Sequence, residues 1–256
     1  MCTLKNLASV ILLMLSLLLL TPTQTSAITK PDKHRGRAPN RSLKQAEVKE
    51  AEARLAEMGY GTGRVDGVFD AVTRNALIAF QKYEGRDVTG RLSREDFDAI
   101  MSANAPQPRD SGYRHVEVDL DRQVLLLTDG SGVVQRVLPV STGSEKHYHE
   151  KGMSGLAYTP RGRFRIYTKL KGWKKSPLGL LYYPNYFSDG LAIHGNPSVP
   201  QSPQSHGCIR IPMSAAAEIS RLLPLETIVL IYDKQSFVSA KDWAEADKQK
   251  QEANVR

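Results

Sequence analysis

Three stretches in the first half of the chain carry apolar residues at the spacing of amphipathic helices. Their apolar positions are Val48, Ala51, Leu55 and Met58 in the first, Val72, Ala76, Phe80 and Tyr83 in the second, and Phe97, Ile100 and Met101 in the third. Gly59 is suited to end the first helix and Asp70 to cap the second. Ser93 and Asp96 form a capping box for the third. The pattern predicts a small module of three helices over residues 43–102.

Residues 103–112 contain two prolines and a glycine and predict a linker. Beyond the linker the hydrophobic period shortens from about 3.6 residues to about 2, which indicates strands. The predicted strands are His115–Leu120, Val124–Thr128, Val133–Val140, Arg163–Tyr167, Leu180–Tyr183, Leu191–His194, Cys208–Ile211 and Thr227–Tyr232. One helix, Ser214–Leu223, interrupts them and ends at Pro224. We expect an α+β multidomain fold, in which the three-helix module precedes a β-rich domain of mixed sheets at residues 113–233.

The two ends of the chain fit neither domain. Residues 7–20 are almost entirely apolar, and Thr25-Ser26-Ala27 supplies the small residues of a signal-peptidase site. This run is shorter than the roughly 20 residues of a membrane span, so we expect residues 1–27 to be a cleaved signal peptide rather than an uncleaved anchor. Residues 28–42 predict a basic linker, and residues 234–256 a charged C-terminal tail. The chain is therefore expected in the periplasm or the cell wall.

Charge and cysteine content narrow the classes of function. The formal net charge of +8 at pH 7 favours polyanionic partners, and export argues against nucleic acid. The sequence has no Gly-rich phosphate loop, no paired-cysteine zinc motif and no nucleic-acid-binding motif. Removal of the signal peptide takes away Cys2 and leaves Cys208 as the one cysteine. A lone thiol in an exported protein is a liability unless it is buried or used.

The segment Ser205-His206-Gly207-Cys208-Ile209-Arg210 surrounds that thiol with reactive groups. Alternate residues of an extended segment face the same side, so His206, Cys208 and Arg210 are expected to share one face. An imidazole or a cation beside a thiol raises its thiolate fraction, and the imidazole can later protonate a leaving amine. Gly207 removes side-chain bulk between His206 and Cys208. These features predict a catalytic cysteine with His206 as its partner.

Other candidate site residues precede this segment. His194-Gly195 ends a predicted strand, and its imidazole or nearby backbone N–H groups can stabilise an oxyanion. A lone histidine at a strand end is more often structural. Tyr182 and Tyr183 are candidate substrate-binding residues, although packing is the commoner reason for a tyrosine in such a strand.

Two sets of motifs carry a family resemblance. In the helical module they are Met58-Gly59-Tyr60, Gly63, Asp66-Gly67-Val68-Phe69, Thr73, Ala76, Phe80-Gln81, Gly85 and Val88-Thr89-Gly90. This set resembles the small three-helix peptidoglycan-binding domain, except that Asp70 stands where the family usually has glycine. Most of these positions are turn or core residues, so the resemblance implies a fold more than specific contacts with the wall.

The second set lies in the β-rich domain. His194-Gly195 followed by Ser205–Arg210 is similar to the signature of the L,D-transpeptidase catalytic domain, also called the YkuD domain. Val140-Ser141-Thr142-Gly143 and Thr159–Ile166 match the strand and turn that precede the active site in that family. Ten residues separate His194 from Ser205, fewer than is common in the family, which leaves the role of His194 and the acceptor preference open.

The resemblance implies an enzyme that acts on peptidoglycan stem peptides without a cofactor or a metal. Cys208 would attack the carbonyl of the third residue of a tetrapeptide stem and expel the terminal D-alanine. The thioester would then pass to a side-chain amine and give a 3→3 cross-link. The implied helpers are His206 as base and then acid, Ser205 to orient His206, His194 and Gly195 with the backbone N–H of Cys208 for the oxyanion, and Arg210 for the site or a substrate carboxylate.

Three alternatives stay open. In an L,D-carboxypeptidase or a related hydrolase, water would resolve the same thioester. A zinc site would use His147, His149, His206 and Cys208, although the first two lie in a predicted polar loop. A non-catalytic wall-binding protein would have no use for an exposed thiol.

Overall fold

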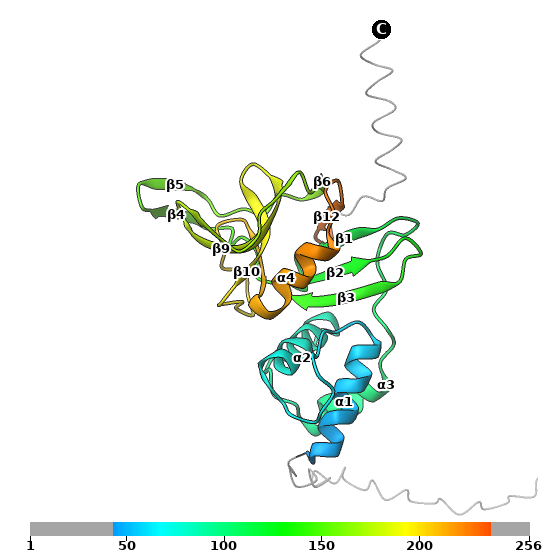
Figure 1. Ribbon diagram of the computed structural model, residues 1–256. Helices are drawn as coiled ribbons and strands as arrows, with labels where there is room; N and C mark the ends of the chain where they lie inside the picture. Colours follow the sequence, from blue (N-terminus) through cyan, green and yellow to red (C-terminus); the bar gives the residue numbers. More distant parts are fainter. Residues whose placement is uncertain (1–42, 237–256) are drawn as a thin grey trace, which may run out of the picture. The chain divides into compact units, whose positions relative to one another are not determined.

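Three helices open the part of the chain that the computed structural model describes, residues 43–236 (Figure 1). They are α1 (Gln45–Glu57), α2 (Ala71–Tyr83) and α3 (Arg94–Ser102). Asp70 Oδ1 accepts two backbone N–H groups from the first turn of α2, and Ser93 with Asp96 forms the capping box of α3. Just beyond α1, Gly59 has a φ of +90°, which glycine adopts without strain. The helical module is built as the sequence predicts.

One five-stranded sheet begins the β-rich domain, in the order β3-β2-β1-β12-β6. Its strands are β1 (His115–Asp119), β2 (Val124–Thr128), β3 (Val134–Pro139), β6 (Gly162–Arg165) and β12 (Ile228–Tyr232). Strands β1 and β12 run parallel, whereas the other neighbours in this sheet are antiparallel. The sheet is therefore mixed, as expected.

A second sheet has the order β11-β10-β9-β7, with β8 also paired to β9. Its strands are β7 (Thr168–Lys169), β8 (Trp173–Ser176), β9 (Gly179–Ser188), β10 (Leu191–Asn196) and β11 (Ile209–Pro212). Strand β11 pairs in parallel with β10 and leads directly into α4 (Met213–Leu222). Residues of both sheets and of α4 share one buried cluster, which includes Val116, Leu125, Ile166, Ile193, Ile209, Ile211, Ile219 and Val229. This core fixes β10 and β11, the strands that carry the motif residues.

Four strands were not predicted: β7, β8 and the two strands of the hairpin β4 (His147–Glu150) and β5 (Met153–Leu156). The expectation that His147 and His149 lie in a polar loop was wrong, since both belong to β4. The side chains of this hairpin are exposed or half-buried on both faces, so no alternation of apolar and polar residues marks it. In Figure 1 the hairpin projects from the rest of the β-rich domain.

The expected signal peptide, the basic linker 28–42 and residues 237–256 of the expected tail lie outside the described residues. All the described residues belong to one compact unit of the chain. Within residues 43–236, no helix combines the length and the apolar character that a membrane crossing requires.

Candidate active site

Cys208 lies directly before β11, at a turn that requires glycine. Gly207 has a φ of +136°, a conformation that residues with a side chain rarely adopt. A Cβ atom at this position would also lie 2.6 Å from the carbonyl oxygen of Tyr158. Any side chain at position 207 would therefore displace the backbone beside the thiol.

Two hydroxyl groups hold this turn. Ser205 Oγ accepts the N–H of Gly207 at 3.0 Å and donates to the carbonyl of Cys208 at 2.5 Å. Thr159 Oγ1 donates to the carbonyl of Gly207 at 2.8 Å. These bonds go to the backbone of the turn and not to His206, which Ser205 was expected to orient. The contribution of Ser205 is thus to fix the backbone around the cysteine.

Cys208 is half-buried and is the free cysteine of the described residues. The backbone N–H of Ala192 donates to its Sγ atom at 3.5 Å. Burial raises the pKa of the thiol, while the Ala192 N–H and the positive charge of Arg210 act in the opposite direction. Because burial is the largest of these effects, the resting group near pH 7 is a thiol that needs a base.

His194 lines the same cavity as this thiol, because β10 and β11 run parallel with His194 opposite Arg210. Its imidazole is almost completely buried, and Nδ1 lies 2.9 Å from the carbonyl oxygen of Gly195. A carbonyl oxygen only accepts, so Nδ1 carries the hydrogen and Nε2 of the neutral ring keeps a lone pair. Burial lowers the pKa of His194 to about 4. The ring is therefore neutral near pH 7 and able to accept a proton.

His206 is held by β4 of the unpredicted hairpin. Its Nε2 atom lies 3.5 Å from Oε1 of Glu150, and its ring packs against that of Tyr148 with centroids 4.6 Å apart. Among the described residues, no hydrogen bond joins the Cys208 thiol to His206 or to His194. The hairpin thus reaches the motif segment, although nothing in the hydrophobic pattern predicts this contact.

A cavity of about 340 Å³ opens at Cys208. Five of the predicted site residues line it: His194, Ser205, His206, Cys208 and Arg210. Tyr148 and Met153 of the β4–β5 hairpin and the turn Ser176–Leu181 between β8 and β9 also line it. Sequence reasoning missed the hairpin and the turn, which contact the motif only through the tertiary fold.

Four predicted site residues do not line this cavity. A Cβ atom at Gly195 would lie 2.6 Å from Cβ of Ala216, so the glycine allows α4 to pack closely on β10. Gly207 shapes the turn described above. Tyr182 and Tyr183 are half-buried and pack against the core, with ring centroids 4.7 Å apart. The structure therefore gives these four residues packing contacts and not a place in the wall of the cavity.

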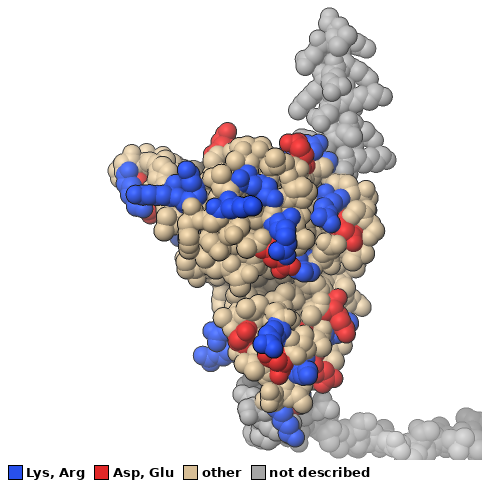
Figure 2. Space-filling model, viewed as in Figure 1, with Lys and Arg blue, Asp and Glu red and all other residues tan. Residues whose placement is uncertain are grey.

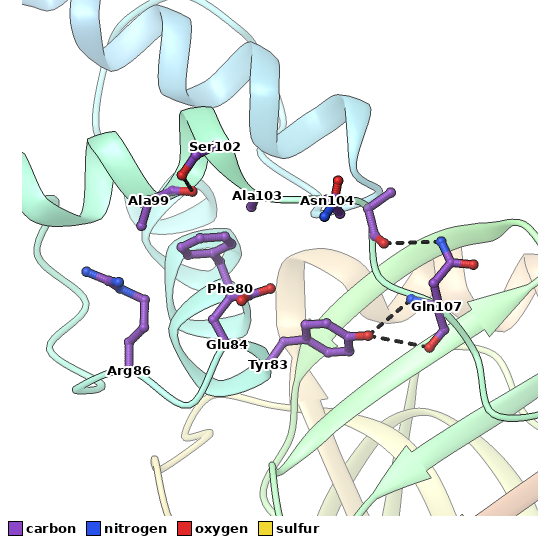
Figure 3. A pocket seen from close by; sticks show the side chains of 10 residues that line it. Phe80, Tyr83, Glu84, Arg86, Ala99, Ser102, Ala103, Asn104 and Gln107 are labelled. Atoms are coloured by element: carbon purple, nitrogen blue, oxygen red, sulfur yellow. Dashed lines mark hydrogen bonds between the residues drawn. The ribbon is translucent and has the colours of Figure 1, made fainter. Parts of the chain in front are cut away.

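A second hollow, of about 430 Å³, lies between α2, α3 and residues 103–107 (Figure 3). Figure 3 shows Tyr83 reaching Gln107, whose N–H donates to the Tyr83 hydroxyl at 3.1 Å. The lining of this second hollow includes no cysteine and no histidine. Over residues 43–236, no group of three or more His, Cys, Asp or Glu side chains is arranged to hold a metal ion. The reactive side chains are thus gathered at Cys208.

Comparisons with known proteins match both domains. Residues 113–231 match the L,D-transpeptidase catalytic domain called YkuD, and residues 44–100 match a putative peptidoglycan binding domain. The crystal structure of an L,D-transpeptidase from Xylanimonas cellulosilytica is 36% identical, with a TM-score of 0.70 over 76% of this chain and 97% of that one. No curated protein matches the chain at a significant level.

Two more solved L,D-transpeptidases are more distant. The protein from Stackebrandtia nassauensis is 23% identical, with a TM-score of 0.44 over 73% of this chain and 90% of that one. The protein from Mycobacterium smegmatis is 20% identical, with a TM-score of 0.38 over 46% of this chain and 58% of that one. The assignment rests on the two domain matches and on the Xylanimonas protein, and by these the chain belongs to the L,D-transpeptidase family, with a YkuD catalytic domain that follows a peptidoglycan-binding domain.

Proposed function

We propose that the chain cross-links peptidoglycan stems through a thioester on Cys208. The observation that carries the proposal is the thiol itself, half-buried on a glycine turn in a cavity that two histidines also line. In the first step Cys208 Sγ attacks the carbonyl of the third residue of a tetrapeptide stem. A thioester forms, the peptide bond to the terminal D-alanine breaks, and D-alanine leaves as its amine takes up the thiol proton.

In the second step the side-chain amine of another stem attacks the thioester. The new amide is the 3→3 cross-link, and the thiol of Cys208 is regenerated. The bond that breaks is a peptide bond, so no external energy source is needed. Arg210 is suited to hold a substrate carboxylate, because it lines the cavity and acts electrostatically on Cys208.

The hydrogen bonds favour His194 as the base in this reaction, in place of His206. His194 is neutral, and its one hydrogen is engaged by the Gly195 carbonyl, so the free lone pair is on Nε2. His206 instead lies beside the Glu150 carboxylate, with its Nε2 atom 3.5 Å from Oε1 of Glu150. In this proposal His194 takes the thiol proton and returns it to the leaving amine, and His206 helps to hold the stem.

We further propose that the chain works outside the cytoplasm, in the periplasm or the cell wall. The polymer that its family modifies is there, and residues 1–27 have the pattern of a signal peptide. The helical module would keep the enzyme on that polymer.

The direct test incubates the mature protein with purified disaccharide-tetrapeptide and weighs the products, with Cys208→Ala as the control. The expected product is a dimer lighter than two substrates by one D-alanine, and the variant should form none. A tripeptide without dimer would instead favour an L,D-carboxypeptidase, in which water resolves the thioester. Equal products from both proteins would contradict the role of Cys208.

A further inference from the structure

One segment of the β-rich domain carries a large excess of positive charge. Residues 151–188 contain eight Lys and Arg residues and no Asp or Glu. The formal net charge of the whole chain is also +8, so acidic and basic residues balance elsewhere. Figure 2 shows Lys and Arg side chains gathered on the visible face of the β-rich domain. A local excess of this kind attracts a polyanion to one place on the surface.

Three exposed cations without acidic partners lie on the hairpin of β8 and β9. We call residues Lys171–Leu181 the β8–β9 arm. Lys171, Lys174 and Lys175 are exposed and form no ion pair within the described part of the chain. By contrast, Arg161 is paired with Glu145 and Asp233. The arm therefore presents three cations whose charge no neighbouring carboxylate neutralises.

The same arm continues into the wall of the catalytic cavity, because its turn, Ser176–Leu181, lines that cavity. Lys174 is paired in register with Leu181, a cavity-lining residue. Lys175 is paired with Leu180, which also lines the cavity, so both lysines lie directly across the hairpin from residues of the cavity wall. An extended ligand that runs along the arm can thus reach Cys208.

Trp173 adds an aromatic surface to these charges. Its side chain is 52% exposed, and its ring contacts that of Tyr182 with centroids 4.9 Å apart. The ring is thus supported by Tyr182 while about half of its surface remains open. Exposed indole rings offer a broad apolar face that suits a sugar ring. Strand β8 is also an edge strand, since its one partner among the described strands is β9.

We infer that the β8–β9 arm is the docking site for an anionic peptidoglycan strand, in which Trp173 stacks on a sugar ring and the three lysines bind free carboxylates of the stem peptides. This inference rests on the proposed function, and it assigns the part of the enzyme that leads the polymer to Cys208. The lysines attract the strand, and Lys174 and Lys175 hold its carboxylates beside the cavity.

A lipid surface is the other anionic partner that exposed Trp and Lys residues suit. The position of the arm favours the polymer, because its turn is part of the cavity wall and a bilayer would cover that entrance. The contact with Tyr182 likewise holds the indole as a supported stacking surface rather than as a side chain free to insert.

The test measures binding of the mature protein to insoluble peptidoglycan freed of other wall polymers, with Cys208→Ala in every variant to prevent turnover. We expect Lys171→Gln/Lys174→Gln/Lys175→Gln to weaken binding about tenfold at low salt and to reduce its salt dependence. Trp173→Ala should weaken it about fivefold, and Trp173→Tyr should restore most of the loss. The charge-matched control removes three exposed cations that lie outside the arm, Arg114→Gln/Arg221→Gln/Lys234→Gln, and should bind within about twofold of the parent. Thermal unfolding of each variant checks that it is folded.

If the arm variant and its control lose binding to peptidoglycan equally, a general effect of charge replaces the inference. If the arm variants bind as the parent does, the inference is wrong. Arm-dependent binding to vesicles of phosphatidylglycerol, with unchanged binding to peptidoglycan, would replace the polymer by a lipid. Release of D-alanine from soluble disaccharide-tetrapeptide by the protein with Cys208 intact is measured separately. The proposed function can thus fail while the binding assay still reports on the arm.

Discussion

At the residue scale, the protonation states of Cys208 and His194 suit each other. Burial raises the pKa of the Cys208 thiol and lowers that of the His194 imidazole to about 4. Near pH 7 both groups are therefore neutral, so the cavity holds a thiol and a free base. The thiolate and the imidazolium then form only when the proton moves during attack. A permanent ion pair of these two groups would be costly, because the cavity is partly buried.

This pairing predicts how the rate of Cys208 acylation depends on pH. His194 acts as a base in its unprotonated form, so the rate should hold between about pH 5 and 7 and fall as the pH drops through about 4. His194→Gln should lower the rate by about 10²- to 10⁴-fold. The variant should then gain activity as the pH rises toward the pKa of the thiol. Stopped reactions with disaccharide-tetrapeptide, analysed by mass, measure the rate.

His206→Gln is the matched control for that experiment, because it removes the other imidazole of the same cavity. We expect His206→Gln to lower the rate of acylation less than His194→Gln does. The fall of the rate as the pH drops through about 4 should be the same as in the wild type. The reverse order of losses would return the role of base to His206, the assignment that the motif alone favoured. Circular dichroism at each pH separates loss of activity from loss of fold.

The residues of the site were predictable as far as local sequence positions them. Ser205, His206, Cys208 and Arg210 lie within six residues of each other, and all of them line the cavity. The contact of His206 with Glu150 joins residues that are far apart in the sequence. It depends on a hairpin whose placement no spacing rule gives. The Nδ1 hydrogen bond that suits His194 to act as a base is likewise visible only in three dimensions.

At the element scale, the close approach of α4 to β10 depends on the absence of a side chain at Gly195. We predict that Gly195→Ala pushes α4 away and lowers the free energy of unfolding by about 1–3 kcal/mol. The Cβ atom would lie 2.6 Å from Cβ of Ala216, so Ala216→Gly in the same chain should recover part of the loss. Urea unfolding of the two single variants and the double variant gives the coupling energy.

Gly130→Ala is the control, since nothing lies within 4 Å of a Cβ atom at that position. Its free energy of unfolding should stay within about 0.5 kcal/mol of the wild-type value. Strictly additive effects of Gly195→Ala and Ala216→Gly would show that α4 is not held by this contact.

Most of the strands that the sequence predicted have buried residues, with β6 as the exception. Strands β1 and β2 are buried along their whole length, and they were found within one residue of their ends. Strands β4, β5 and β8 have no buried residue, so the hydrophobic period carries no signal there. All three contribute to the catalytic cavity or to the arm that leads to it. The hydrophobic pattern therefore did not predict the exposed strands around the cavity.

At the scale of the whole molecule, the helical module is joined to the β-rich domain by buried backbone contacts. The N–H of Val137 in β3 donates to the carbonyl of Gly59 at 2.9 Å, and Val137 belongs to the hydrophobic core of the module. Lys82 of α2 is 5% exposed, and its Nζ atom donates to the carbonyl of Val140 at 2.9 Å. The sequence predicted the two domains but not this shared core, because contacts between domains leave no periodic signal.

Lys82 makes the stability of this joined structure depend on pH. Burial lowers the pKa of Lys82 from 10.5 to about 8. Between these values the unfolded chain binds more protons than the folded one, so the free energy of unfolding rises as the pH increases from about 8 to about 10.5. Relative to Lys82→Met, which has no proton to lose, the wild type should gain about 2–3 kcal/mol across this window. Urea unfolding at a series of pH values measures the difference.

The exposed Lys49 of α1 supplies the matched control, since Lys49→Met removes an ammonium group that solvent already surrounds. The difference between the wild type and Lys49→Met should stay constant over the same pH range. A constant difference for Lys82→Met as well would mean that water reaches Nζ, and that the two domains separate readily. A rising difference would mean that the ammonium stays enclosed between α2 and the carbonyls that follow β3, so that the wall-binding module and the catalytic domain move as one body on the polymer.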